Sequence, residues 1–391
     1  MPREPQNRSE KKIKRAGGAT HQATARKDRT HAPATRAATA RKVKAGKAET
    51  GGANAREDGA PKAGQSRASS ASGSRRAESK KTCVAVVGAG RLGSALALAL
   101  DLSGYAVTAL VARRAARARL AARALSPRPL ALDATQLDSI PDAVDLILVT
   151  TPDDQIAPVA ARLATVFAAR RAAGSPRRAR RIVLHASGAL LSGVLAPLGK
   201  QGFSLGSLHP LVSIGAPATS GARNLRGAFY CLEGEPHALA AARKIVRTLG
   251  GQSFSLAARD KALYHAAAVI ASGHTVALFS LAAELLARCG LSHARARQVL
   301  LPLLASTLDN LRSHAPDEAL TGTFARADLS TVRKHLAALR DAGDARGATA
   351  IYALLGERSL QLAARRHKFD SSVAAEIALL LRQAFGGARD E

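Results

Sequence analysis

Tryptophan is absent from this 391-residue chain, methionine occurs once, and Phe, Trp and Tyr together make up 3% of the residues. Acidic residues are scarce as well, with 29 Asp and Glu against 58 Lys and Arg, so the formal net charge is +29. The hydrophobic share is nevertheless 47%, and a chain of this length can bury two domain cores. The composition therefore allows two folded domains and leaves the excess of positive charge to be explained.

Cysteine is also rare. The three cysteines, Cys83, Cys231 and Cys289, are odd in number and far apart in the sequence. Such spacing offers no metal-binding knuckle and indicates reduced thiols in a cytoplasmic protein, so we expect no metal site. No apolar run reaches the length of a membrane span without a charged residue or a histidine, and we expect no membrane association.

Much of the positive charge lies at the N-terminus. Residues 1–81 contain 21 Lys and Arg against 7 Asp and Glu, and residues 1–80 contain no Phe, Tyr or Trp. Such a segment cannot bury enough apolar surface to offset its ordering entropy, so we predict that residues 1–80 form a disordered basic tail. Dispersed Lys and Arg can bind nucleic-acid phosphates, but no aromatic residue is present for base stacking. A solvated tail is the favoured interpretation, and nucleic acid is the weaker alternative.

The strongest local pattern is K-T-C-V-A-V-V-G-A-G-R-L-G at residues 81–93. A short apolar run ends in three glycines, and a helical pattern follows, which is the order found in dinucleotide-binding units. Gly88 permits the tight turn, Gly90 lets the backbone approach a pyrophosphate, and Gly93 lets the helix pack against the strand. The predicted cofactor contacts here are Gly88, Gly90, Arg91, Leu92 and Gly93. The alternative is a strand–helix turn without a ligand.

Strands and helices alternate from residue 81 onwards. We predict strands at 84–87, 106–111, 130–132, 143–150, 181–185, 204–208, 227–233 and 253–256, with a helix at 236–249. Helical patterns alone follow, at 257–289, 292–313, 328–342, 347–365 and 371–385. The fold class is therefore α/β, with a doubly wound, mainly parallel Rossmann sheet followed by an all-α C-terminal domain. The predicted boundaries are 1–80 for the tail, 81–256 for the dinucleotide-binding domain and 257–391 for a helical substrate or dimerisation domain.

The end of the second strand indicates which dinucleotide would bind. An NAD site places an acidic residue there, yet no acid occurs between Asp101 and Asp133, and the strand is followed by Arg113 and Arg114. Two guanidinium groups suit a 2′-phosphate, so we predict NADP(H) as the cofactor. The alternative is that this pair merely begins a basic helix that continues to Arg123.

Polar residues follow the later strands, where ligands of such sheets bind. Thr151 follows the fourth strand and is assigned to the cofactor. Ser187 follows the fifth strand and His209 the sixth, and either could hydrogen-bond a substrate or the nicotinamide amide. Asp153 and Asp154 are better explained as a cap of the helix that follows them.

The first residues of the long helical pattern carry Lys261 and His265, four positions apart and on one helix face. Reduction of a C=O or C=N bond needs a proton donor, and a buried Lys or His can supply it. The candidate catalytic residues are thus Lys261, His265, His209 and Ser187. Lys261 could instead be solvated and His265 could be a satisfied interdomain histidine. Further on, Arg326 could bind an anionic group, and Asp328 could equally cap a helix.

Taken together, the motifs are G-A-G-R-L-G, T-P-D-D-Q-I, H-A-S-G, H-P-L, F-Y-C-L-E-G, K-A-L-Y-H-A-A-A, L-T-G-T-F-A-R-A-D and T-V-R-K-H-L. Over residues 82–385 this set resembles a bacterial family that joins a Rossmann-like domain to a helical domain of unknown function. That family is similar to pyrroline-5-carboxylate reductase, ketopantoate reductase, prephenate dehydrogenase and 3-hydroxyisobutyrate dehydrogenase. The resemblance implies an NADP-dependent oxidoreductase of unestablished substrate whose helical domain mediates formation of a homodimer.

Three positions depart from the family pattern. Gly273 stands where the family usually has Asn, Thr323 stands where it has Pro, and Ala327 replaces the Gly of an R-G-D sequence. The missing Asn would remove a substrate or nicotinamide contact unless His274 replaces it. The favoured hypothesis is an NADP(H)-dependent oxidoreductase acting on a small carbonyl or imine compound in a cleft between the domains. The alternatives are a non-catalytic NADP(H) sensor and a nucleic-acid-associated protein.

Overall fold

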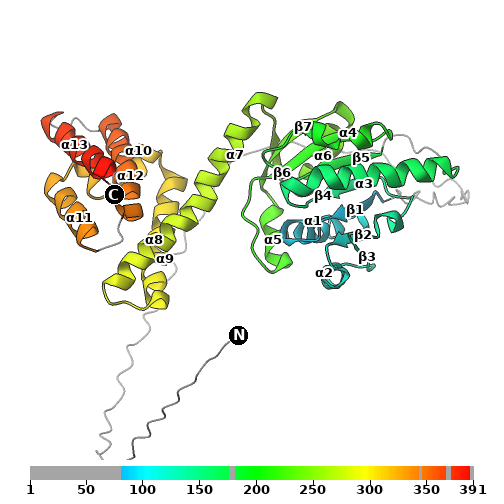
Figure 1. Cartoon of the computed structure of the whole chain (residues 1–391), viewed down its shortest axis with the longest axis horizontal. Helices are drawn as coiled ribbons and strands as arrows, with labels where there is room; N and C mark the ends of the chain where they lie inside the picture. The colour runs from blue at the N-terminus through cyan, green and yellow to red at the C-terminus, as the bar shows by residue number, and fades with distance from the viewer. Residues whose placement is uncertain (1–80, 176–180, 343–345, 367–370, 388–391) are drawn as a thin grey trace, which may run out of the picture. The chain divides into compact units, whose positions relative to one another are not determined.

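The computed structural model describes residues 81–175, 181–342, 346–366 and 371–387, so the predicted tail lies outside the described residues. One eight-stranded sheet has the order β3-β2-β1-β4-β5-β6-β7-β8 (Figure 1). Neighbouring strands are parallel except for β6 and β7, which are antiparallel. The strands are β1 (Cys83–Val87), β2 (Ala106–Ala112), β3 (Leu130–Asp133), β4 (Leu146–Val149), β5 (Ile182–His185), β6 (Ser204–Pro210), β7 (Phe229–Gly234) and β8 (Gln252–Phe254). This confirms the predicted doubly wound, mainly parallel sheet.

Both faces of the sheet are covered by helices, which explains why its inner strands are apolar on both sides. The side chains of β1 alternate between two cores: Val84 and Val86 belong to one, Ala85 and Val87 to the other. The first core includes residues of four helices, α1 (Arg91–Asp101), α2 (Ala115–Ala122), α5 (Ala218–Leu225) and α6 (Pro236–Thr248). The second includes residues of α3 (Asp153–Ala172) and α4 (Ala196–Gly199).

All eight predicted strands occur, but the fourth is shorter than the pattern 143–150 indicates. A turn hydrogen bond from the Val144 N–H to the Pro141 carbonyl, 3.1 Å long, lies just before the strand. The residues just before Leu146 therefore form a turn, and β4 begins at Leu146.

The described residues after β8 form helices and turns, as predicted. The expected long helix at 257–289 is present over residues 258–288, and within it α7 (Lys261–Val269) and α8 (Thr275–Arg288) are joined by a π-helical turn (Ile270–His274). The later helices are α9 (His293–Ser313), α10 (Pro316–Ala319), α11 (Leu329–Asp341), α12 (Arg346–Arg366) and α13 (Ser371–Gly387). Single π-helical turns inside α-helices frequently occur at functional sites. The sequence pattern did not reveal this one.

The start of α11 confirms one of the two interpretations of Asp328. Its carboxylate accepts a hydrogen bond of 3.0 Å from the Thr331 N–H and one of 2.7 Å from the Thr331 hydroxyl. These bonds stabilise the charged form and hold the pKa of Asp328 below its usual value. Asp328 is therefore the N-cap of α11.

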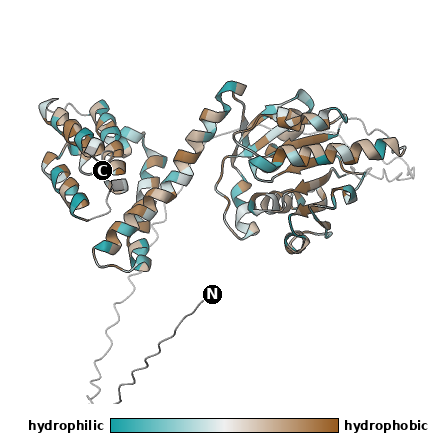
Figure 2. Cartoon of the chain, viewed as in Figure 1, coloured by the Kyte–Doolittle hydropathy of each residue, from teal (hydrophilic) through white to brown (hydrophobic). Residues whose placement is uncertain are grey.

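The helix spanning residues 258–288 is apolar and little buried. In Figure 2 brown segments recur along α7 and α8, between pale and teal ones. Among the described residues it is the one helix long and apolar enough to cross a membrane, with a mean hydropathy of 1.7 in a window that is 6% buried. The core helix of a soluble protein passes the same test of length and composition, but such a helix is mostly buried. Its most exposed large side chains are Leu263, Ile270 and Val276.

Candidate active site

The turn after β1 requires glycine for reasons of space. Gly88 has a φ of +116°, and a Cβ there would lie 2.6 Å from the Thr150 carbonyl carbon and from the Thr151 nitrogen. A Cβ at Gly93 would overlap the Gly88 carbonyl oxygen and the Thr150 hydroxyl. By contrast, a Cβ at Gly90 would meet only the Gly88 oxygen, at 3.8 Å. Two glycines thus permit close packing of β1, α1 and β4, while the third faces open space.

The surroundings of this turn suit a phosphate. The N-terminus of α1 has no side-chain cap and no acidic residue in its first turn, so the positive end of the helix dipole is not neutralised by its own side chains. The Thr151 hydroxyl is buried and has no hydrogen-bond partner among the described residues. Arg91 is exposed at the first position of α1, whereas Leu92 packs against the core. These features fit the predicted dinucleotide.

Arg113 and Arg114 directly follow β2 and are both exposed. The nearest acid on the adjoining strand is Asp133, which is in register with Ala112. Its carboxylate accepts hydrogen bonds from the Thr135 N–H and hydroxyl, so it already has local partners. The arginine pair is therefore available at this strand end for an anionic group.

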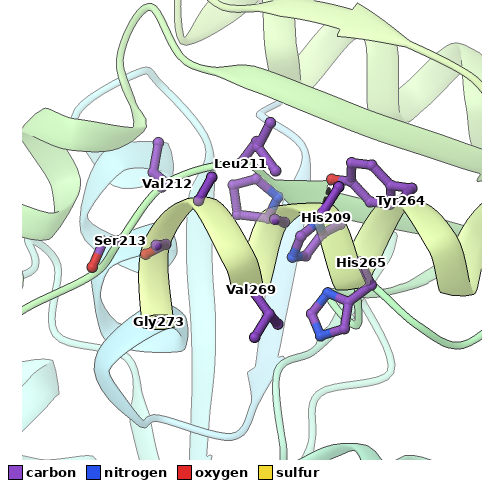
Figure 3. A pocket seen from close by; sticks show the side chains of 13 residues that line it. His209, Leu211, Val212, Ser213, Tyr264, His265, Val269 and Gly273 are labelled. Atoms are coloured by element: carbon purple, nitrogen blue, oxygen red, sulfur yellow. Dashed lines mark hydrogen bonds between the residues drawn. The ribbon is translucent and has the colours of Figure 1, made fainter. Parts of the chain in front are cut away.

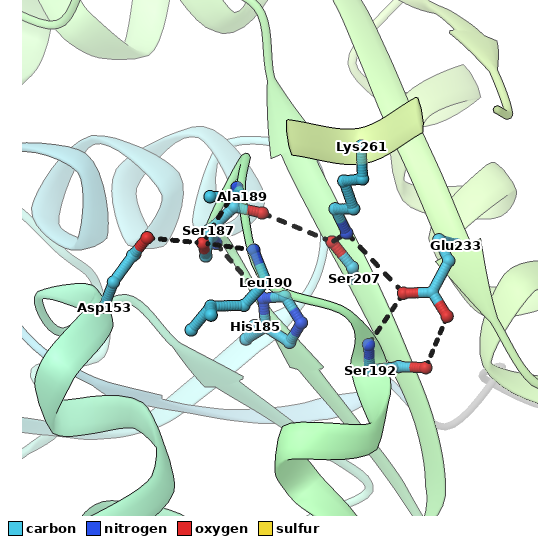
Figure 4. A network of polar contacts seen from close by, with 9 residues as sticks. All are labelled: Asp153, His185, Ser187, Ala189, Leu190, Ser192, Ser207, Glu233 and Lys261. Carbon is cyan, nitrogen blue, oxygen red and sulfur yellow. Dashed lines mark hydrogen bonds and ion pairs between the residues drawn. The ribbon is translucent and has the colours of Figure 1, made fainter. Parts of the chain in front are cut away.

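Lys261 is buried, with 3% of its side chain exposed, so the solvated interpretation was wrong. Its Nζ donates a 2.8 Å hydrogen bond to the Ser207 hydroxyl and lies 3.6 Å from Oε2 of Glu233 (Figure 4). The Ser192 N–H and hydroxyl each donate a 2.7 Å hydrogen bond to the same carboxylate. Burial lowers the pKa of Lys261, and the charge of Glu233 opposes that shift. The first residue of α7 is thereby attached to β6 and β7.

Ser187 belongs to the same network, and its hydroxyl hydrogen-bonds only to other residues of the protein. The hydroxyl donates a 2.8 Å hydrogen bond to Asp153 and accepts two, from the Ala189 and Leu190 N–H groups. One proton and two lone pairs are the full capacity of a serine hydroxyl. Ser187 therefore orders the loop after β5. Its carbonyl accepts a 3.5 Å hydrogen bond from Ser207, which joins this loop to Lys261.

The capping role expected of Asp153 and Asp154 is not what the structure shows. Both lie in the first turn of α3, where negative charge suits the helix dipole, but no side chain caps this helix. Asp153 instead holds Ser187. Asp153 thus makes a tertiary hydrogen bond to a residue 34 positions away in the sequence, in place of the expected cap of its own helix.

A cavity of about 510 Å³ lies between the end of β6 and one face of α7 and the π-helical turn (Figure 3). His209, Tyr264 and His265 line it. Nδ1 of His209 is 2.6 Å from the Tyr264 hydroxyl, and the His209 ring meets the rings of Tyr264 and His265 edge to face. The structure thus brings two of the predicted catalytic residues, His209 and His265, into one pocket. Ser187 and Lys261 are not among the lining residues.

Burial keeps the side chains of His209 and Tyr264 in their uncharged forms. It lowers the pKa of His209 to about 4, helped by the nearby charges of His265 and Lys261, and it raises the pKa of Tyr264. His209 and Tyr264 are therefore uncharged at neutral pH. Nδ1 of His265 is buried without a hydrogen-bond partner among the described residues. The interpretation of His265 as a fully satisfied histidine therefore does not hold for this nitrogen, which faces Gly188.

Gly188, in the loop after β5, permits the two histidines to approach each other. A Cβ at Gly188 would overlap Nδ1 of His265 and would lie 2.8 and 2.9 Å from Cε1 and Nε2 of His209. Any other residue here would displace one of the rings.

Sequence reasoning missed Tyr264 and Glu233. Tyr264 lies within K-A-L-Y-H, directly before His265, and Glu233 lies near the end of the seventh strand in F-Y-C-L-E-G. An acidic partner for a buried lysine could have been suspected, because buried charges are normally paired; the side chain of Glu233 is 21% exposed. Among the described residues, no group of three His, Cys, Asp or Glu side chains is placed to hold a metal ion.

The sheet order and the glycine turn define a protein with a Rossmann-like domain. The family profiles agree, because the Rossmann-like domain profile matches residues 67–210 and the profile of a domain of unknown function, DUF2520, matches residues 228–359. The chain therefore joins a Rossmann-like domain to a DUF2520 domain, as the resemblance implied. No curated protein is significantly similar to it in sequence.

Several solved structures are similar to this chain. A candidate NADP oxidoreductase of Bacteroides fragilis is 20% identical, with 78% of this chain and 98% of that chain covered and a TM-score of 0.53. A protein of Thermotoga maritima is 23% identical, with 78% and 99% covered and a TM-score of 0.49. A reductive aminase of Aspergillus terreus, in complex with NADPH and ethyl levulinate, is 17% identical, with 79% and 95% covered and a TM-score of 0.43. At 20% identity, the likeness to the Bacteroides fragilis structure establishes the fold alone.

The first prediction concerns His185, which ends β5 with 1% of its surface exposed. Burial, together with the charge of Lys261, lowers its pKa to about 4 from the ordinary 6.5. Between these values the unfolded chain binds more protons than the folded one, so stability rises with pH and is lost on acidification. One such histidine contributes on the order of 3 kcal/mol to this change.

Urea denaturation of the wild type and of His185→Gln at several pH values between 4 and 7 would measure the effect. We expect a shallower pH dependence in the variant, whatever its stability at pH 7. His293→Gln, at an exposed position of α9, is the control. Equal slopes for His185→Gln and wild type would contradict the assignment.

Proposed function

We propose that the protein is an NADP(H)-dependent oxidoreductase that transfers hydride to or from a small carbonyl or imine compound. The observation that carries the proposal is the pocket with His209, Tyr264 and His265. It lies near the carboxyl end of β6, and the glycine turn follows the carboxyl end of β1 in the same parallel set. Cofactor and reactant sites of such sheets lie along that edge.

The residues proposed to hold NADP(H) are Gly88, Gly90, Arg91, Leu92, Gly93, Arg113, Arg114 and Thr151. The pyrophosphate would lie against the start of α1, and the arginine pair would bind the 2′-phosphate. When bound there, NADPH supplies the hydride. The chain itself must then orient the acceptor and deliver one proton to its oxygen or nitrogen.

Tyr264 and His265 are the groups we assign to those tasks. With its proton on Nδ1, His209 donates to the Tyr264 oxygen and leaves the tyrosine O–H free to bind the acceptor. His265 lines the pocket, and we assign it the proton that the reduced oxygen or nitrogen gains. Lys261 acts as a positioning residue, because its bonds to Ser207 and Glu233 hold the start of α7 in place.

A non-catalytic NADP(H)-binding sensor is the second candidate. The observation in its favour is Gly273, which leaves the pocket wall without a side chain at that point. Saturable NADPH binding without oxidation by any ketone, aldehyde or imine of a broad panel would favour the sensor.

We also propose a cytoplasmic homodimer. The location is supported by the cysteines, which are free thiols. Dimerisation is supported by the side chains of Leu263, Val276 and Ile270, which are 74%, 70% and 62% exposed along one continuous helix. An apolar surface of this kind is covered in most soluble proteins, and a second copy of the chain offers a matching one.

The arginine pair gives a prediction about cofactor choice. Arg113→Ala/Arg114→Ala should raise the Kd of NADPH at least tenfold and leave the Kd of NADH nearly unchanged, because only NADPH carries the 2′-phosphate. Fluorescence titration of each cofactor measures this. Arg117→Ala/Arg119→Ala, on the adjoining helix, is the control for loss of general positive charge. An unchanged NADPH affinity would reject the assignment.

The pocket gives a prediction about the reaction. Tyr264→Phe should reduce kcat/KM by about 10²–10³-fold, as expected for loss of one hydrogen bond to a developing negative charge. His265→Gln should reduce it by about 10²–10⁴-fold through loss of the proton donor. NADPH affinity should remain as in wild type in both variants. A Tyr264→Phe variant with the turnover of the wild type would contradict the proposal that the Tyr264 hydroxyl binds the acceptor.

The apolar helix gives a prediction about assembly. Leu263→Asp/Val276→Asp should convert a dimer into a monomer at micromolar concentration, because two buried unpaired carboxylates oppose association. Size-exclusion chromatography with light scattering measures the mass. Leu120→Asp, at an exposed leucine of α2, is the control. A wild-type monomer would contradict the proposal.

A further inference from the structure

We infer that the pocket binds an uncharged, largely apolar carbonyl compound, and that the bare backbone at Gly273 sets the size of the group it admits. The inference rests on the proposed function and names its substrate class. It excludes keto acids and imino acids as preferred substrates.

The lining of the pocket is apolar over most of its surface. The hydrocarbon part includes Pro210, Leu211, Val212, Ala267, Val269 and Ala271. None of the lining residues in the described part of the chain is Asp, Glu, Lys or Arg. A carboxylate that entered this pocket would lose its water without meeting a lysine or an arginine, which is unfavourable.

The nearest buried cation does not change this. Lys261 is 3% exposed and already holds Glu233 and Ser207, so its charge is compensated inside the protein. His209 and Tyr264 are uncharged at neutral pH. The polar corner of the pocket, formed by His209, Tyr264 and His265, therefore offers hydrogen bonds to an oxygen but no permanent positive charge of a lysine or an arginine to an anion.

Gly273 provides the space. It lies in the π-helical turn and lines the pocket (Figure 3). A Cβ built there would meet only Cγ1 of Val269, at 3.8 Å, which is ordinary van der Waals contact. A Cβ at this position is thus accepted without strain, and a side chain extending from it would occupy part of the cavity. Its absence leaves room for a bulky apolar group of the substrate beside Val269.

A matched pair of ligands tests the charge preference. Cyclohexanone and 4-oxocyclohexane-1-carboxylate share one ring and differ in the carboxylate. We expect saturation-transfer NMR on the full-length protein with NADP⁺ to give a Kd at least tenfold lower for cyclohexanone. Equal affinity, tighter binding of the carboxylate, or no binding of either at 10 mM would overturn the inference.

A variant tests the role of Gly273. Gly273→Leu should weaken binding of 4-tert-butylcyclohexanone at least tenfold while changing that of cyclohexanone less than threefold. Ala161→Leu, on the exposed face of α3, adds the same side chain away from the pocket and should change neither. An equal effect of Gly273→Leu on both ketones, or no effect, would overturn the size assignment.

Binding and turnover separate the two levels of the proposal. Preferential binding of the neutral ketones, with no NADPH oxidation by any carbonyl or imine compound, would reject the oxidoreductase and keep the pocket assignment. NADPH oxidation by the carboxylate in clear preference to cyclohexanone would keep the oxidoreductase and reject the substrate class.

Discussion

The bonds of Lys261 hold the start of α7 against the sheet. A lysine ammonium with almost no exposed surface must be paired, and here Glu233 and Ser207 provide the partners. Burying two opposite charges gains little net stability, because desolvation offsets their attraction. What the pair supplies is a fixed geometry. The next turn of the helix then carries Tyr264 and His265 to the end of β6, where the pocket forms.

The second constraint is the need for glycine at positions where a Cβ atom would collide with a neighbouring group. Gly88 and Gly93 let α1 pack against the ends of β1 and β4, and Gly188 lets His209 and His265 share one space. At Gly273 a Cβ atom would meet only an ordinary van der Waals contact, so glycine is not needed for packing there. Its lack of a side chain leaves that part of the pocket open. Glycine thus permits close packing at three places and leaves a cavity wall bare at the fourth.

Much of the fold was predictable because its signals are local. Apolar strands buried on both faces, glycine turns and helical periodicity are each read within about ten residues. The candidate site was predicted only in part. His209 and His265 were identified because they follow a strand or open a helix, whereas Tyr264 and Glu233 were missed since nothing local distinguishes them. Ser187 and Asp153 were identified, but their bond to each other was not, because it spans 34 residues.

The sequence by itself determined the order of strands and helices, the glycine turn after β1 and the two arginines after β2. These depend on backbone conformation and on neighbours along the chain, which the residue order contains directly. The tertiary structure decided which polar groups are buried and which hydrogen-bond partners they have. Lys261 is buried and paired, the Ser187 hydroxyl has all the hydrogen bonds it can make, and Nδ1 of His265 is buried without a partner among the described residues. Burial and hydrogen bonding are properties of packed surroundings, so only the folded chain could assign them.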